Sequence, residues 1–152
     1  MVTEDIQPQI GILIKNISNI VSTELNNNLK PYNITGVQAR VLFFINSASK
    51  KGNVFQKDIQ KHLKLANPTV TGIVQRLEEK KLIERFISND DSRYKCHVLT
   101  DEGHSIIKEL ADFAENTMEQ RILNNFSEDE KDILTILLRR ILKNLENNNC
   151  EL

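Results

Sequence analysis

The stretch from residue 56 to residue 99 changes its periodicity twice, and this limits the fold more than any other feature of the sequence. A short helical run is followed by a tight Leu-Ala-Asn connection and by a longer helical run that begins at an Asn-Pro pair. Two runs rich in β-branched and aromatic residues, 82–88 and 94–100, then flank the polar turn sequence Asn-Asp-Asp-Ser-Arg. Two helices and a hairpin in this order predict a helix-turn-helix followed by a β-hairpin wing.

The longer helical run divides into an apolar face and a polar face. Asn67 is expected to be its N-cap, because Pro68 suits the first helical position, where its missing N–H costs nothing. Apolar residues at helical spacing should face the core: Val70, Ile73, Val74 and Leu77. The remaining positions are short, polar or basic and should face outward: Thr69, Thr71, Gly72, Gln75 and Arg76.

Helical segments flank this region on both sides. They begin or end at recognisable signals: Lys30-Pro31 ends the first, and the capping residues Thr35, Thr100 and Ser127 begin others. The last helix is apolar around so much of its circumference that a partner subunit should cover part of it. The sequence therefore predicts a single, mainly α-helical domain with a small β-hairpin wing. Its expected parts are dimerisation helices at 6–30 and 104–146, a winged helix-turn-helix at 35–100 and a flexible tail at 147–152, all within one domain of residues 1–152.

The net charge of −1 hides an asymmetry along the chain. Residues 1–54 carry +2 and residues 55–97 carry +3, whereas residues 98–152 carry −6. A basic region joined to an acidic one indicates a surface with one end that faces an anion. The sequence has no apolar run long enough for a membrane helix and no signal-peptide pattern, so a cytoplasmic protein with no membrane contact is expected.

Two segments carry a resemblance to a known family. NPTVTGIVQRLEEKKLIER, from residue 67, resembles the recognition helix of the MarR family of bacterial transcriptional regulators and its exit into the wing. DSRYKCHVLTDEG, from residue 91, resembles that family's wing signature of Asp-x-Arg, a strand, Leu-Thr and Gly. The order of elements agrees over nearly the whole chain. The resemblance implies a homodimer with one winged helix-turn-helix in each subunit and an interface built from both chain ends.

The resemblance also implies which residues contact double-stranded DNA. In the family, the wing arginine enters the minor groove or lies along the backbone, and the aspartate two residues earlier orients it; here these are Arg93 and Asp91. The narrow minor groove has a strongly negative potential, which suits a guanidinium held on a hairpin. The full set of expected DNA-binding residues is Asn67, Thr69, Thr71, Gln75, Arg76, Asp91, Arg93 and Lys95.

Two positions depart from the family pattern. Gly72 stands where members often carry a larger, frequently basic residue, so a DNA contact is in doubt there and the helix is less stable by about 1 kcal/mol than with alanine. Lys81 stands where the family usually has glycine after the recognition helix. If that position needs a left-handed backbone, Lys81 is strained or the helix leads differently into the wing.

Other kinds of chemistry find less support. The sequence has no nucleophile elbow, no glycine-rich phosphate loop and no carboxylate pair beyond helix caps and surface charge, so no enzyme and no cofactor are expected. The histidines His62, His97 and His104 lack metal-ligand spacing, so no metal is expected. Whether Cys96 or Cys150 senses oxidants stays open.

The sequence is thus interpreted as a sequence-specific transcriptional regulator, a repressor that binds a pseudopalindromic operator as a homodimer. The resemblance further implies a small aromatic or anionic effector. Candidate neighbours of such a cavity are Ile12, Asn16, Tyr32, Phe43 and Phe113, but apolar and aromatic residues at such positions suit an ordinary core equally, so no effector site is assigned. The alternatives are a winged-helix module that binds protein, and an architectural protein that binds DNA without sequence preference.

Overall fold

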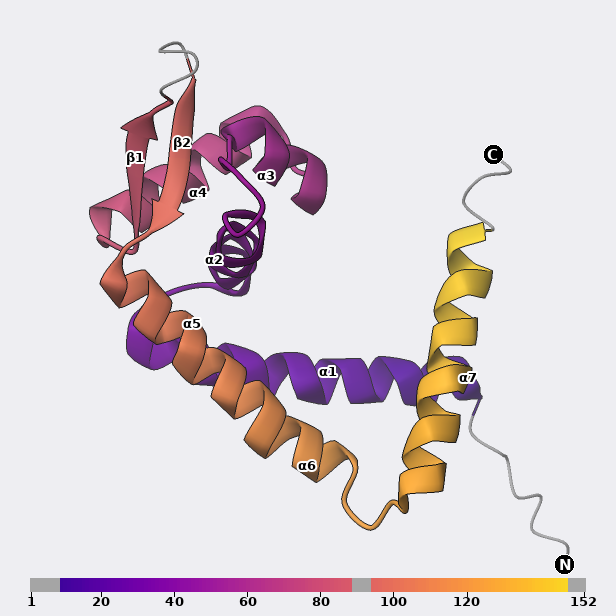
Figure 1. Cartoon of the computed structure of the whole chain (residues 1–152). Helices are drawn as coiled ribbons and strands as arrows, with labels where there is room; N and C mark the ends of the chain where they lie inside the picture. Colours follow the sequence, from indigo (N-terminus) through magenta and orange to yellow (C-terminus); the bar gives the residue numbers. More distant parts are fainter. Residues whose placement is uncertain (1–8, 89–93, 148–152) are drawn as a thin grey trace, which may run out of the picture. The chain divides into compact units, whose positions relative to one another are not determined.

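A computed structural model describes residues 9–88 and 94–147 of the chain. The chain forms two compact units, one that ends at Ala114 and one that begins at Glu115. The elements of the first unit are α1 Ile10–Leu29, the 3-10 turn η1 Lys30–Tyr32, α2 Gly36–Ala48, α3 Gln56–Leu63, α4 Asn67–Glu79, β1 Ile83–Ile87, β2 Lys95–Leu99 and α5 Asp101–Phe113 (Figure 1). A π-helical turn, η2 Ala114–Met118, leads to α6 Glu119–Ile122 and α7 Glu128–Asn147. The mainly helical fold with one hairpin is confirmed.

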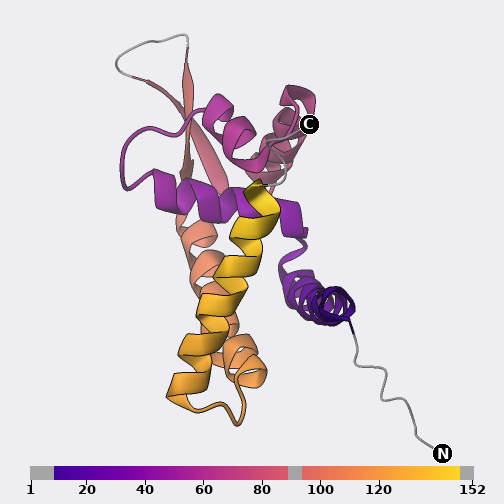
Figure 2. The ribbon, with the colours of Figure 1, turned by 90° about the vertical axis from the view of Figure 1, so that its right-hand side faces the viewer.

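The core of the first unit is built around α2, whose Val41, Leu42 and Ile45 are fully buried. This helix packs against α3, α5 and β2. Figure 2 shows that α3, α4 and the hairpin lie at the same end of this unit. The apolar residues expected to face inward on α4 do so: Val70, Ile73, Val74 and Leu77 are all buried. Burial of one stripe on each helix therefore fixes which side chains of α4 face outward.

Side-chain caps begin three of the helices as the sequence predicts. The Thr35 hydroxyl accepts from the N–H of Gln38, and the Gln38 side chain accepts from the N–H of Thr35, which completes a capping box at α2. Thr100 accepts from the N–H of Gly103 at α5. Ser127 and Glu130 exchange the same pair of bonds ahead of α7. The predicted starts of α2, α5 and α7 are confirmed.

The expected N-cap of α4 is wrong. Ala66 is the N-cap and its side chain makes no capping bond, whereas Asn67 is the first helical residue and Pro68 the second. Proline is tolerated in this first turn, since the N–H groups there have no partner within the helix. The side-chain oxygen of Asn67 instead accepts hydrogen bonds from Gln56 and Gln60 on α3, so it does not cap α4.

The residue at position 81, just after α4, has a left-handed backbone, which is the conformation that the family's usual glycine at this position suits. Lys81 has φ of +58°, and its N–H donates to the carbonyl of Glu78 at 2.8 Å. The next N–H, of Leu82, donates to the carbonyl of Leu77 at 3.0 Å. These two bonds make a Schellman motif, and Leu77 and Leu82, at the two positions where this motif usually has apolar residues, are both buried. Lys81 therefore occupies a conformation that favours glycine.

The wing is an antiparallel pair in which Ile83 lies opposite Leu99 and Ile87 lies opposite Lys95. Its base is joined to the helix-turn-helix by a bridge between Phe55 and Cys96, and the N–H of His97 donates to the carbonyl of Val54 at 2.8 Å. The hairpin is therefore fixed at its base to the segment that enters α3.

In the second unit, α7 leaves a large apolar surface uncovered. The helix has no buried residue. Its exposed apolar side chains are Ile133, Ile136, Leu137, Leu138, Leu142 and Leu145. Exposed apolar side chains also run along α1, in the first unit: Ile10, Ile12, Leu13, Ile14, Ile17, Ile20 and Leu25. Apolar faces of this length are typical of protein–protein interfaces.

Candidate nucleic-acid interface

The outer face of α4 is polar and exposed. Four of the residues that the sequence assigns to DNA binding lie on it with exposed side chains: Thr69, Thr71, Gln75 and Arg76. The Gln75 amide donates to Glu79 at 3.1 Å. A Cβ added at Gly72 would meet no atom within 4 Å. The middle of this face is consequently open. No side chain at residue 72 would hinder the entry of α4 into a groove of DNA.

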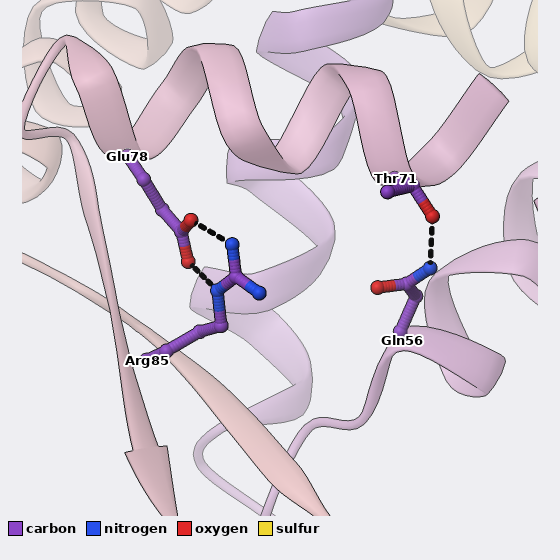
Figure 3. Close-up of polar contacts among 4 residues, drawn as sticks. All are labelled: Gln56, Thr71, Glu78 and Arg85. Carbon is purple, nitrogen blue, oxygen red and sulfur yellow. Dashed lines mark hydrogen bonds and ion pairs between the residues drawn. The ribbon is translucent and has the colours of Figure 1, made fainter. Parts of the chain in front are cut away.

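A polar cluster joins the start of α4 to α3, and we call its four residues, Gln56, Gln60, Asn67 and Thr71, the amide cluster. The Gln56 amide nitrogen donates to Asn67 Oδ1 and to Thr71 Oγ1, each at 2.7 Å; the second bond is drawn in Figure 3. The Gln60 amide nitrogen donates to the same Asn67 oxygen at 2.5 Å. Thr71 Oγ1 donates to the carbonyl of Asn67 at 2.9 Å. The cluster thereby holds two of the expected DNA-binding side chains in fixed orientations.

An ion pair connects the other end of α4 to the wing. The guanidinium of Arg85, on β1, donates two hydrogen bonds to the carboxylate of Glu78, on α4 (Figure 3). The hydrogen bonds that Arg85 donates to Glu78 raise the pKa of Arg85 above its ordinary value. Both side chains are partly exposed, so the pair contributes modestly to stability and acts chiefly as a geometric tie between helix and wing.

A basic hollow of about 280 Å³ lies between the wing and the start of α3. Its lining includes Phe55, Gln56, Lys57, Arg85, Tyr94, Lys95 and His97. The ammonium of Lys57 lies 5.5 Å from the ring centre of Phe55 and 5.6 Å from that of Tyr94. The single ammonium of Lys57, held over two aromatic rings beside Lys95, gives this side of the wing a positive potential suited to phosphate. Lys95, an expected DNA-binding residue, is exposed there.

His97 lies beneath this hollow with only 1% of its surface exposed. Its Nδ1 has no hydrogen-bond partner among the described residues. Burial lowers the pKa of His97, an effect that the carboxylate of Glu78 opposes and the cation of Arg85 reinforces. The imidazole is therefore neutral at neutral pH and supports the wing as part of the core.

Two of the three predicted wing contacts fall outside the described residues. Asp91 and Arg93 lie in the segment 89–93, so their placement in the minor groove stays a prediction. The structure brings Asn67, Thr69, Thr71, Gln75 and Arg76 together on α4, and it places Lys95 on the wing.

Three residues that position this interface were missed from the sequence: Gln56, Gln60 and Arg85. The four-residue spacing of the two glutamines places them on the same face of α3 and was a usable signal. Arg85 had no such signal, because its pairing with Glu78 depends on how the Schellman turn directs β1 back along α4.

The side chains considered for other chemistry lie apart. His62 is on α3, His97 on β2 and His104 on α5. Within residues 9–88 and 94–147, no group of three or more metal-binding side chains comes together. Cys96 is a fully buried thiol on β2. In the same ranges, no helix is long and apolar enough to span a membrane.

Comparison with known proteins agrees with this architecture. The sequence model of the MarR family matches residues 32–93. The multiple antibiotic resistance protein MarR of Salmonella typhimurium is 30% identical over 133 residues, which cover 88% of this chain and 90% of the relative. The chain belongs to the MarR family. The HTH-type transcriptional regulator PecS of Dickeya dadantii is 29% identical over 146 residues, 95% of this chain and 87% of the relative.

Solved structures of another MarR-like regulator share the fold. MepR, a transcription regulator of the Staphylococcus aureus multidrug efflux pump MepA, superposes with a TM-score of 0.77 at 28% identity over 90% of this chain and 98% of its own. A MepR–DNA complex superposes with a TM-score of 0.72 at 28% identity, over 90% and 96% of the two chains. The protein is accordingly a winged-helix, DNA-binding transcriptional regulator of the MarR family, not an enzyme.

Proposed function

We propose that the protein is a repressor that binds a pseudopalindromic operator as a homodimer and acts in the cytoplasm. The observation that carries the proposal is the outer face of α4, where exposed Thr69, Thr71, Gln75 and Arg76 lie opposite a buried apolar stripe. Short polar side chains on an exposed helix suit base edges and phosphates in the major groove. Arg93, oriented by Asp91, would add a contact in the flanking minor groove, and Asn67 and Lys95 would complete the interface.

The homodimer is proposed from the uncovered apolar faces of α1 and α7. Residues 6–30 and 104–146 would contribute the interface, residues 35–100 the winged helix-turn-helix, and all of them would belong to one domain of residues 1–152. A two-fold dimer presents two copies of α4, which matches half-sites about one helical turn apart. The apolar side chains on α7, which are exposed among the described residues, would then be covered by the partner subunit.

A small aromatic or anionic effector is proposed to regulate DNA binding. In its support, a cavity of about 440 Å³ lies among α1, α2 and α5, with Leu25, Phe43 and Leu110 as apolar walls and Arg40 as a cation. Such a ligand changes operator affinity only by preferring one of two dimer arrangements. Benzoate, the simplest aromatic carboxylate, is a suitable first probe of ligand-dependent thermal stability and operator affinity.

The decisive experiment compares affinity for duplex DNA from upstream of the protein's own gene with affinity for scrambled DNA, over a series of salt concentrations. Wild type, Arg93→Ala and a charge-matched control on α5, Lys108→Ala, are measured. Tight selective binding with a steep salt dependence, weakened by Arg93→Ala and not by the control, supports the proposal.

The same experiment separates the two other functions that the sequence leaves open. Equal, weak binding of wild type and Arg93→Ala to both DNAs would point to a winged-helix module that binds protein. Tight binding without sequence preference would point to an architectural protein.

A further inference from the structure

The amide cluster determines which atoms of Asn67 can meet DNA. Asn67 Oδ1 accepts from Gln56 at 2.7 Å and from Gln60 at 2.5 Å. An amide oxygen has two lone pairs, so both are occupied. Among the described residues no acceptor contacts Asn67 Nδ2, and the side chain is exposed in the first turn of α4. The residue can therefore offer N–H donors to a ligand but no free acceptor.

The direction of these bonds follows from Thr71. Its hydroxyl donates to the backbone carbonyl of Asn67 at 2.9 Å, so its oxygen accepts from the Gln56 amide nitrogen (Figure 3). The second hydrogen on that nitrogen goes to Asn67 Oδ1. If both amides were turned over, the oxygen of Gln56 would face a hydroxyl whose hydrogen is already used. The helix backbone thus fixes the orientation of the cluster through Thr71.

We propose that Asn67 is a specificity-determining residue that donates to an acceptor on a base edge, guanine O6 or N7 above all, and that Gln56 and Gln60 are positioning residues for it. This inference rests on the proposed operator binding. An unrestrained asparagine pairs with adenine by donating and accepting at once. Asn67 has no acceptor left for that pairing, whereas guanine presents two acceptors in the major groove and no donor at those atoms.

Gln56 and Gln60 do not lie on the exposed outer face of α4 that would contact DNA. Both are half-buried on α3, and each gives its nitrogen to other side chains of the cluster. Changing Gln56 consequently alters what Asn67 presents while leaving Asn67 in place. If Gln56 were merely structural, substituting it would change the affinity for every DNA sequence by the same factor. If Gln56 positions Asn67, substituting it changes which base the protein prefers.

The test is selection of preferred sites from randomised duplex DNA, followed by competition among duplexes that differ at the selected base. Wild type, Gln56→Met, Gln56→Glu and Asn67→Ala are used, each as the full-length protein. Gln56→Met removes the donor without adding charge, so the preference for guanine should fall by about fivefold. Gln56→Glu introduces a group that only accepts. The Thr71 hydroxyl and the Asn67 amide should then both turn to donate to that carboxylate, and the preferred base should become adenine or cytosine, which present amino groups.

Lys57→Gln is the matched charge control for Gln56→Glu. It makes the same change of charge one residue away, at an exposed side chain outside the amide cluster. It should lower affinity for all sequences alike and leave the preferred base unchanged. Circular dichroism and thermal unfolding of each variant establish that α3 and α4 remain folded.

The outcomes separate this inference from the function on which it rests. A wild-type protein without base preference would overturn both. A wild-type preference that both Gln56 variants retain unchanged would overturn the role of the amide cluster alone. Loss of affinity by the same factor for every sequence in Gln56→Met and Asn67→Ala would also overturn it, because a phosphate contact carries no sequence information.

Discussion

Gly103, in the first turn of α5, lies directly against the carbonyl oxygen of Leu82, at the end of the turn that follows α4. That carbonyl accepts from the N–H of Thr100, and the Thr100 hydroxyl donates to the carbonyl of Lys81 at 2.7 Å. The start of α5 is thus joined to the exit of the recognition helix by bonds that require close approach of two backbones. The glycine of the wing signature has a packing role.

Gly103→Ala is expected to lower the free energy of unfolding by about 1–3 kcal/mol, because a methyl group would overlap the Leu82 carbonyl and force the backbones apart. Urea unfolding followed by circular dichroism measures the change. A loss below about 0.5 kcal/mol would contradict the packing role, since that is the usual range for surface changes.

Gly72→Ala makes the same substitution where the structure leaves space, on the outer face of α4. It should raise the free energy of unfolding by about 0.5–1 kcal/mol, because glycine loses more conformational freedom in a helix than alanine. Measured beside Gly103→Ala in the same urea series, it is the matched control. Destabilisation by both substitutions would show that the two sites do not differ as the structure indicates.

Lys81→Gly should stabilise the protein by about 1 kcal/mol, since Lys81 holds φ of +58° in the Schellman turn. Lys81→Ala is the control, because it removes the charge and the long side chain but keeps the Cβ that causes the strain. Thermal unfolding of both variants and of wild type measures the difference in stability. Equal stability of the two variants would assign any effect of residue 81 to its charge.

His97 should make stability depend on pH. Burial keeps its pKa in the folded state below its ordinary value, whereas the unfolded chain binds the proton at about pH 6.5. The unfolded state therefore binds more protons in this range, and the contribution of His97 is fully present above about pH 6.5 and declines as the pH falls below it. Urea unfolding between about pH 5 and pH 7.5 should show this decline in wild type.

Two variants assign the decline to this residue. His97→Phe should flatten it in the same pH range, because the buried proton acceptor is gone, while the exposed His104→Asn should retain it. A decline of the same size in His97→Phe would place its origin in other groups.

Leu142→Arg tests the apolar face of α7 and rests on the proposed homodimer. Leu142 is 60% exposed in the single chain, so the substitution should be harmless to a monomer but should break the dimer if this face is the interface. Asn144→Arg places the same cation on an exposed polar position of the same helix. Sedimentation equilibrium should find a monomer only for Leu142→Arg; a dimer for both would move the interface elsewhere.

Local patterns were sufficient to predict the wing, the buried stripe of α4 and the caps at Thr35, Thr100 and Ser127, because each depends on residues a few positions apart. The start of α4 was mispredicted for the opposite reason. Asn67 has the side chain of an N-cap, but the glutamines of α3 compete for its oxygen. That competition arises only when the tight turn brings α3 against α4, which no local pattern reports.

The burial of Cys96 has a consequence for oxidation. Its side chain is fully covered on β2, where the backbone of Cys96 pairs with Phe55 on one side and with Phe86 of β1 on the other. An oxidant or an alkylating reagent can reach this sulfur only after the hairpin separates from its neighbours. The rate at which Cys96 reacts would then measure how often the wing opens, and the thiol serves as a built-in reporter of local unfolding beside the DNA-binding helix.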